Sequence, residues 1–466
     1  MKRKLLSVLL AASMVLTMAP AVYAAGDSLP VADENGVITL TENVEISDII
    51  TFGEGKIEAD TLDLNGFTLT VERLDVEDVL TITDSGENGT VTSHENTTVV
   101  VWNGGELNID GGIFDTETSY SNKQRTILNM GTVNMNGGTV MGYTGIRNTA
   151  YNNGETFDDV ECNLYGGSVE LKDPGYWGVV LLGPGMNEDG TANNDAVVVN
   201  MYDGFSITGA NGSQGIATNA SSGAYAGYTF NMYGGTIEMD GTDGCGMYLP
   251  AYGEVNVYDG HVKAEQGIRI AAGELNITGG TIEGTALLTE DTDLVNGGSG
   301  GTQGAIVIGK ASIYYPGNLT VNISEDANII NTADGNGVKP TIVVSDKNMA
   351  NDQTVDIKGP DGSTTGDTFS ISDNSIQVNI GDVTIDGDIV KVSNISGSDT
   401  DDGGSTSLKV EGTTVNGNVI NQSAEGSVEI VDGAVVTGDV TTKNDASVYM
   451  EESSVEGTVS TEDGSS

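Results

Sequence analysis

The sequence is short of cysteine, of basic residues and of long apolar runs, and each shortage excludes a class of protein. Its 2 cysteines are too few for a disulfide framework. The 18 basic residues stand against 68 acidic ones, and the resulting formal charge of −50 disfavours nucleic acid and anionic lipid as partners. Beyond the N-terminal segment no apolar stretch is long enough to span a bilayer as a helix, so we expect no membrane insertion of the mature chain.

Proline and helix-forming runs are also scarce, whereas glycine is abundant. The chain has 8 Pro and 66 Gly, and its apolar segments are short and rich in Val, Ile and Thr. This composition favours strands joined by tight turns. Because 37% of the residues are apolar, the chain is too hydrophobic for a disordered protein.

The N-terminal segment has the features of a bacterial secretory signal. Lys2-Arg3-Lys4 is basic, the apolar stretch from Leu5 to Ala19 is too short to cross a bilayer, and Val22-Tyr23-Ala24-Ala25 offers small residues for cleavage. We therefore expect residues 1–25 to be a signal peptide. The mature protein is expected to be secreted and extracellular, either free or associated with the cell wall.

One phrase recurs seven times in the middle of the chain: apolar, Asn, apolar, any residue, Gly or Asp, Gly. Two apolar residues flank each Asn, which is the alternation of a strand with one buried face, and the glycines follow as a turn. A unit repeated every 20–37 residues cannot bury its own apolar face, so it must stack on its copies. The repeated asparagines are Asn108, Asn134, Asn163, Asn200, Asn231, Asn256 and Asn276.

These repeats predict an all-β fold, a right-handed parallel β-helix or solenoid. Most phrases are followed by two more short strands, which gives three strands and three corners per coil, and no gap carries the 3.6-residue stripe of a helix. The main β-helix is expected over 26–338. An irregular linking region with Pro and Gly/Ser/Thr clusters follows over 339–382, and tighter coils of about 20 residues occupy 383–466.

The repeat pattern runs to within a few residues of Ser466, although the last coil of a solenoid needs a polar cap. Three expectations follow. The last coil is frayed, or it makes an end-to-end contact with another chain, or the natural protein continues further.

Two motifs carry a resemblance to a known family. Leu62-Asp63-Leu64-Asn65-Gly66, followed by the Asn–apolar–x–Gly–Gly repeats, resembles the pectin-lyase-like right-handed parallel β-helix family. More closely, roughly residues 37–335 resemble its non-enzymatic, adhesin-like members on bacterial surfaces. The resemblance implies an exported bacterial protein with a structural or adhesive role at the cell surface.

A row of tyrosines gives the candidate site. In four consecutive phrases a Tyr lies two residues after the Asn, and alternation points both side chains outward. One interpretation is a stripe that binds neutral glycan, on a polysaccharide or a host or cell-wall glycan, because aromatic rings and amides suit pyranose rings and their hydroxyls. The other is that the rings and amides form ladders that only stabilise the stack. The residues are Tyr165, Tyr202, Tyr233, Tyr258, Asn163, Asn200, Asn231 and Asn256.

Catalysis is the alternative, because many relatives of this fold are polysaccharide lyases or glycoside hydrolases. Arg147 and Arg269 are expected about four coils apart, near ~20 Å, which is too far to act together. Asp203 and Asp259 are expected ~10 Å apart, at the edge of the ~6.5–9.5 Å range for inverting hydrolysis. Asp at a turn has a simpler explanation. We assign no catalytic residue and expect a protein without enzymatic activity.

No metal site or cofactor is expected, apart from Ca²⁺ held weakly by the acidic surface. Cys162 takes the inward position that Val199 and Phe230 take in the next phrases, and Cys245 lies in another part of the repeat. Both are predicted to be buried free thiols.

Overall fold

The structure is a computed structural model. It describes residues 28–117, 124–152, 155–156, 159–173, 175–187, 190–219, 225–287, 303–309, 319–324, 326–336, 338–345, 355–358, 376–380, 384–392, 408–422, 427–443 and 446–462. The predicted signal peptide, 1–25, lies outside these residues. Within them every regular element is a strand, and no helix has the length and apolarity needed to cross a membrane.

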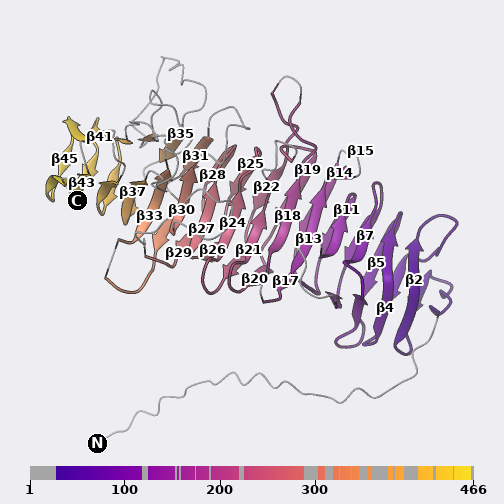
Figure 1. The fold of residues 1–466 in the computed structure, drawn as a ribbon. Helices are drawn as coiled ribbons and strands as arrows, with labels where there is room; N and C mark the ends of the chain where they lie inside the picture. The colour runs from indigo at the N-terminus through magenta and orange to yellow at the C-terminus, as the bar shows by residue number, and fades with distance from the viewer. Residues whose placement is uncertain are drawn as a thin grey trace, which may run out of the picture.

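The chain forms a right-handed parallel β-helix, as the repeats predicted. Successive coils stack along one axis, from the indigo coils at the N-terminus to the yellow coils at the C-terminus (Figure 1). Most coils contribute three strands, and each strand pairs in parallel with the equivalent strands of the coils before and after it.

The first strands of the coils form a 16-stranded sheet. In their order along the sheet they are β1 (Val37–Thr39), β3 (Thr61–Asp63), β5 (Val79–Thr83), β8 (Glu106–Ile109), β11 (Thr132–Met135), β16 (Val160–Leu164), β19 (Val197–Met201), β22 (Thr229–Met232), β25 (Glu254–Val257), β28 (Glu274–Ile277), β31 (Leu319–Ile323), β35 (Ile376–Ile380), β34 (Val355–Lys358), β38 (Leu408–Glu411), β41 (Ser427–Val431) and β44 (Ser447–Glu451).

The second and third strands belong to a 24-stranded sheet, because the long strands β2 (Val44–Phe52) and β4 (Thr68–Val76) span both positions. The second strands are β6 (Thr90–Ser93), β9 (Ile113–Thr116), β12 (Thr139–Gly142), β17 (Gly167–Leu171), β20 (Phe205–Gly209), β23 (Thr236–Met239), β26 (His261–Ala264), β29 (Thr281–Gly284) and β32 (Asn328–Asn331). The third strands are β7 (Thr97–Val101), β10 (Arg125–Asn129), β13 (Thr144–Thr149), β18 (Trp177–Leu182), β21 (Gln214–Ala217), β24 (Cys245–Leu249), β27 (Gln266–Ile270), β30 (Gly304–Gly309), β33 (Pro340–Ser345), β37 (Asp388–Val392), β40 (Val419–Asn421), β43 (Val440–Lys443) and β46 (Val459–Glu462).

Two small sheets complete the fold. In the C-terminal coils the second strands form a separate 4-stranded sheet. A 2-stranded antiparallel hairpin projects from the long connection between β13 and β16. These strands are β36 (Thr384–Asp386), β39 (Thr414–Asn416), β42 (Val435–Val436), β45 (Ser454–Val455), β14 (Tyr151–Asn152) and β15 (Glu155–Thr156).

Apolar and polar residues alternate along each strand, so that apolar side chains fill the interior of the coils. In β11, Val133 and Met135 are fully buried, whereas Thr132 and Asn134 lie on the outer face. The same pattern repeats from coil to coil, so one continuous hydrophobic core extends from Ile38 to Val440. Burial of each such side chain stabilises the folded state by about 1.5–3 kcal/mol. Because neighbouring coils bury these side chains, the stability of the stack depends on contacts between coils.

The second glycine of the repeated phrase is required by the coil geometry. At Gly138 the backbone φ is +78°, and an added Cβ would lie 2.6 Å from the carbonyl oxygen of Gly112 in the preceding coil. Both the positive φ and the close approach of two backbones exclude a larger residue without strain.

The region predicted to be an irregular link contains strands of the main sheets. In its described parts β33 pairs with β30 and β37, and β35 pairs with β31. The order of strands is inverted here, because β34 precedes β35 in the chain yet lies between β35 and β38 in the sheet. The boundaries at 339 and 383 stay a prediction.

Candidate functional site

The repeated asparagines form a continuous ladder on the outer face of the 16-stranded sheet. Parallel pairing places each Asn directly opposite the next, and each Nδ2 donates to the Oδ1 of the Asn in the preceding coil. Between Asn108 and Asn276 these hydrogen bonds measure 2.9–3.0 Å. Asn322 on β31 extends the ladder by one coil, although its phrase lacks the Gly pair.

Several ladder amides use their second hydrogen as well. Asn163 Nδ2 also donates to Glu161 Oε1 at 2.9 Å, and Asn256 Nδ2 donates to Glu254 Oε1 at 2.9 Å. In each case the carboxylate belongs to the residue two positions earlier on the same strand. In each of these two amides both Nδ2 hydrogens are therefore donated within the protein, and little hydrogen-bonding capacity remains for a ligand.

The four tyrosines form a stack beside the ladder. Ring centroids are 4.8 Å apart for Tyr165 and Tyr202, 5.1 Å for Tyr202 and Tyr233, and 4.9 Å for Tyr233 and Tyr258. The interplanar angles are 20°, 17° and 5°, so the rings lie nearly parallel, each over the next. The spacing follows that of the coils, which fixes the rings at one stacking distance.

Stacking decides which parts of the tyrosines stay accessible. The faces of the inner rings are covered by neighbouring rings, whereas the edges and hydroxyls form an exposed stripe. Tyr165, Tyr233 and Tyr258 remain 44%, 42% and 44% exposed, and Tyr202 is half-buried. Burial and the flanking Tyr165 and Tyr233 raise the pKa of Tyr202, so its hydroxyl stays protonated and can donate a hydrogen bond.

The ladder and the stack are the most regular features of the described surface. No family model, curated protein or solved structure matches the chain.

The carboxylates considered for catalysis lie at turns. Asp203 and Asp259 follow β19 and β25, with one intervening coil in which Gly234 takes the same position. A Cβ at Gly234 would overlap the Asp203 carboxylate, and Asp259 Oδ1 accepts from the backbone N–H of Gly260 at 2.7 Å. Both side chains thus have local structural contacts.

The arginines considered for catalysis lie four coils apart, on β13 and β27. Arg269 is buried, and its guanidinium carbon lies 5.5 Å from the centre of the Tyr248 ring, a cation–π contact between adjacent coils.

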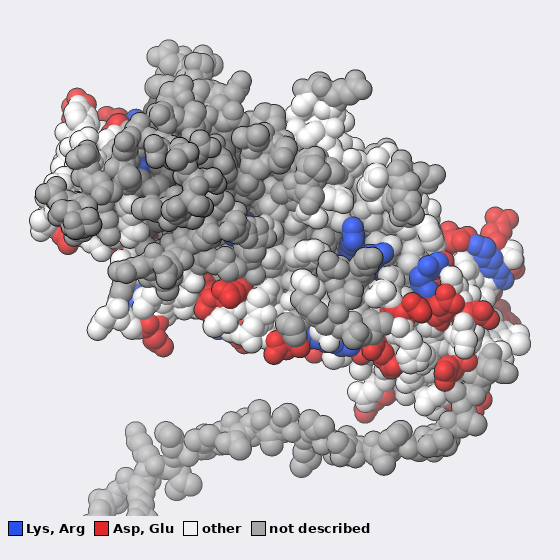
Figure 2. Space-filling model, in the orientation of Figure 1, with Lys and Arg blue, Asp and Glu red and all other residues white. Residues whose placement is uncertain are grey.

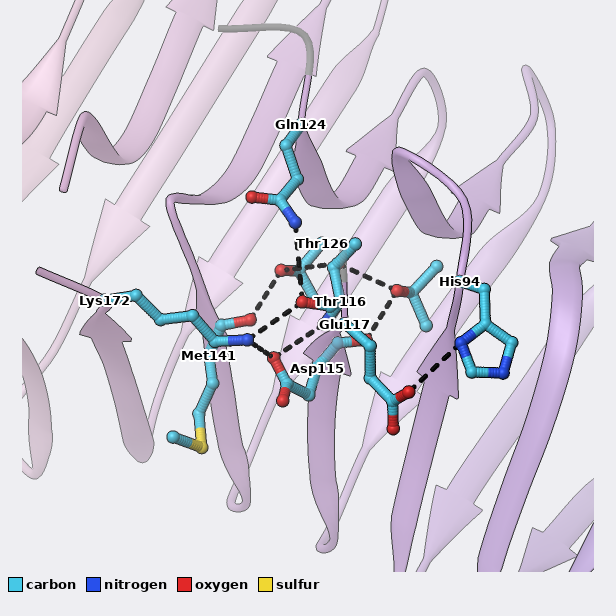
Figure 3. Close-up of polar contacts among 9 residues, drawn as sticks. His94, Asp115, Thr116, Glu117, Gln124, Thr126, Met141 and Lys172 are labelled. Atoms are coloured by element: carbon cyan, nitrogen blue, oxygen red, sulfur yellow. Dashed lines mark hydrogen bonds and ion pairs between the residues drawn. The ribbon is translucent and has the colours of Figure 1, made fainter. Parts of the chain in front are cut away.

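A polar cluster that the sequence did not indicate lies at the corner between the second and third strands, with some of its side chains buried (Figure 3). Lys172 Nζ pairs with Asp115 at 2.5 Å and donates to the carbonyl oxygen of Thr116 at 2.8 Å. Nearby, His94 Nδ1 lies 3.1 Å from Glu117 Oε2 at the surface. Because Lys172 follows β17 and Asp115 lies on β9, two coils away, the ion pair acts as a brace along the stack.

Metal-binding groups and thiols add no further site. Among the described residues no group of three or more His, Cys, Asp and Glu side chains is arranged to hold a metal ion. Cys162 and Cys245 are buried free thiols, as predicted. Burial raises the pKa of Cys245 to about 12 and that of Cys162 still further, so both thiols are chemically inert in the folded protein.

Proposed function

We propose that the protein is an exported bacterial surface protein of the pectin-lyase-like β-helix group with a structural or adhesive role. Its adhesive face is the stripe of tyrosine edges and hydroxyls on Tyr165, Tyr202, Tyr233 and Tyr258. The partner is a neutral polysaccharide or a host or cell-wall glycan that lies along the stack.

The tyrosine stack carries this proposal. It is a straight row of aromatic edges at about one coil spacing, presented on a face that the asparagine ladder holds flat. A polymer lying on such a row meets the same group repeatedly, so weak contacts add up along its length. The basic residues are few and the charge is −50, which supports a neutral rather than an anionic partner.

The stacking of the tyrosine rings changes how a sugar can contact them. A pyranose ring cannot lie flat on the inner tyrosines, since their faces are covered by their neighbours. Contact with the stripe therefore depends on the hydroxyls and ring edges. The ladder amides, Asn163, Asn200, Asn231 and Asn256, serve mainly to hold the tyrosines in line.

The test is glycan-array binding of the full secreted chain and of two variants. Tyr202→Phe with Tyr233→Phe removes two hydroxyls and keeps the stack, whereas Tyr202→Ala with Tyr233→Ala removes the rings. We expect both double variants to lose most of the array signal, and only the alanine variant to unfold at a lower temperature. Tyr449→Ala is the matched control, because Tyr449 is 52% exposed on β44 and bonds to Glu451 outside the stripe.

Loss of stability without any change in glycan binding would contradict the adhesive proposal. It would leave the tyrosines as a purely structural stack. Release of reducing sugars or unsaturated uronates from a polysaccharide panel would instead establish the enzymatic alternative, a glycoside hydrolase or a polysaccharide lyase.

A further inference from the structure

The turn between β7 and β8 carries an exposed asparagine, Asn103, which is followed by Gly104. Within the part of the chain that the structure describes, neither the Asn103 side chain nor the Gly104 backbone N–H makes a hydrogen bond. In such a dipeptide the glycine nitrogen, unhindered by a side chain, can attack the Cγ of the asparagine before it. Both reacting groups are therefore available at this turn.

The backbone at Gly104 has room to rotate. Its φ is +86°, a conformation that glycine adopts without strain, and no atom lies within 4 Å of an added Cβ. The two ends of the turn, in contrast, are fixed. The N–H of Gly105 donates to the carbonyl oxygen of Trp102 at 2.8 Å, and the N–H of Trp102 donates to that of Val76 in the preceding coil at 2.9 Å. Only the tip of the turn, Asn103 and Gly104, is left without such contacts among the described residues.

Other Asn-Gly pairs are held by their surroundings. In Asn65-Gly66 the Asn amide donates to a backbone carbonyl at 3.0 Å and the Gly N–H donates to a carboxylate at 2.7 Å. In Asn136-Gly137 both groups donate as well, at 2.8 and 3.1 Å. In Asn88-Gly89 the Gly N–H donates to Asp84 Oδ2 at 2.7 Å.

Among the pairs in which the structure describes both residues, Asn103-Gly104 thus differs from the rest. In every other pair the Asn side chain, the Gly N–H or both are hydrogen-bonded within the protein. These pairs begin at Asn35, Asn65, Asn88, Asn103, Asn136, Asn211 and Asn416.

We propose that Asn103 is a site of spontaneous deamidation in the folded protein. The Gly104 nitrogen gives up its proton and attacks Cγ of Asn103, the new N–Cγ bond forms, the Cγ–Nδ2 bond breaks, and the amide nitrogen leaves as ammonia. Water then opens the resulting succinimide at either carbonyl, which leaves isoaspartate or aspartate at position 103. Water is the co-reactant, and nothing is oxidised or reduced. The site is separate from the tyrosine stripe and does not depend on its function.

The reaction places a new negative charge in an acidic part of the molecule. On the face shown in Figure 2, acidic side chains gather along the lower edge and around the N-terminal coils, to which β7 and β8 belong. Like charges repel, so the product carboxylate adds to the repulsion among these coils. Isoaspartate also inserts an extra carbon into the backbone of a turn whose two ends are fixed.

Peptide mapping by mass spectrometry tests the proposal on the full folded chain, incubated at neutral pH and digested at acidic pH to stop further reaction. We expect Asn103 to deamidate about tenfold or more faster than Asn65 and Asn136, because reaction at those pairs first requires their hydrogen bonds to break. The same chain unfolded in urea is the matched control. There all three pairs lose their contacts, and since each Asn precedes a Gly, their rates should become similar.

Asn103→Gln provides a second measurement, because it keeps an amide at the turn but would have to close a larger ring. The peptide that contains position 103 should accept methyl groups from an isoaspartyl methyltransferase in the incubated wild type and not in this variant. Equal rates at Asn103, Asn65 and Asn136 in the folded chain overturn the proposal, as does a preference for Asn103 that persists in urea. An Asn103 that stays intact in the folded chain while the unfolded chain reacts overturns it as well.

Discussion

At the scale of single residues, the ladder predicts an unequal cost for removing asparagines. Asn231 donates to Asn200 at 2.9 Å and accepts from Asn256 at 3.0 Å, so Asn231→Ala removes the ladder donor to Asn200 Oδ1 and the ladder acceptor of Asn256 Nδ2. We expect the free energy of unfolding to fall by about 1–3 kcal/mol in urea denaturation. Asn136→Ala, which removes one exposed bond to Asp110 outside the ladder, should cost about 0.5 kcal/mol or less. Equal effects in the two variants would contradict a structural role for the ladder.

The buried thiols predict a specific pH dependence. Because burial raises the pKa of Cys245 to about 12 and that of Cys162 in the same direction, both stay protonated in the folded chain while the unfolded thiols ionise near pH 8.5. The unfolded state then binds fewer protons, so stability is full below about pH 8.5 and declines as the pH rises above it.

The variant Cys162→Val with Cys245→Ala should show a shallower decline in unfolding midpoint above about pH 8.5 than the wild type. Val is suited to position 162, because Val133 and Val199 take the equivalent places in the adjacent coils. In the native wild type a thiol reagent should label neither cysteine until denaturant is added. Rapid labelling under native conditions would show that the thiols are accessible.

At the scale of the strand, glycines within the third strands, such as Gly215 in β21, exclude larger side chains because the next coil packs closely against them. A Cβ at Gly215 would lie 2.3 Å from Ile237 Cγ2 and 2.6 Å from the carbonyl oxygen of Gly246. We expect Gly215→Ala to lower the free energy of unfolding by about 3 kcal/mol, measured by chemical denaturation. Gly104 is the control, since its φ is +86° and nothing lies within 4 Å of an added Cβ. Gly104→Asn should cost about 1 kcal/mol or less, because Asn tolerates this conformation.

The sequence predicted the elements well wherever one residue type recurs in register. Alternation around Asn134 and Asn163 was enough to place the strands, their inward faces and the outward Tyr165, because each coil repeats the same local constraint. The sequence was less informative where the constraint is not local. Lys172 reaches Asp115 across two coils, and this contact depends on how the intervening loops return the chain to each new coil. It does not follow from spacing along the chain.

The orientation of the stacked tyrosine rings could not be predicted from the sequence either. The sequence placed the four rings in one row but left open whether they present faces or edges. That choice depends on side-chain rotation about a fixed backbone, and neighbouring rings at about one coil spacing decide it. Likewise the strands around Pro340 were predicted to be irregular, because proline and Gly/Ser/Thr clusters obscure the alternation that β33 retains.

At the scale of the whole molecule, the excess of acidic groups works against the stack. With a formal charge of −50, the coils repel one another through solvent, and added salt screens this repulsion. Raising sodium chloride from about 0.01 M to about 1 M shortens the screening length from ~30 Å to ~3 Å. We therefore expect a higher unfolding temperature in high salt, followed by circular dichroism. A midpoint that falls with salt would show that attractive ion pairs such as Lys172–Asp115 dominate instead.

Calcium can be tested in the same experiment. At equal ionic strength, millimolar Ca²⁺ should raise the unfolding temperature more than Mg²⁺ if the acidic surface holds calcium weakly, because Ca²⁺ accepts irregular oxygen ligands more readily. Identical midpoints in the two salts, together with no calorimetric heat for Ca²⁺, would exclude this binding.

Every rung of the asparagine ladder donates in the same direction, toward the N-terminal end of the molecule. The amide dipoles therefore add head to tail and polarise one another along the axis. At the first rung the donor end meets the carboxylate of Glu106, which accepts from Asn108 at 3.0 Å, much as an acidic residue neutralises the start of an α-helix. Although its surface repeats from coil to coil, the rod has electrically distinct ends. A chain-like partner lying along it would bind in one polarity rather than in both.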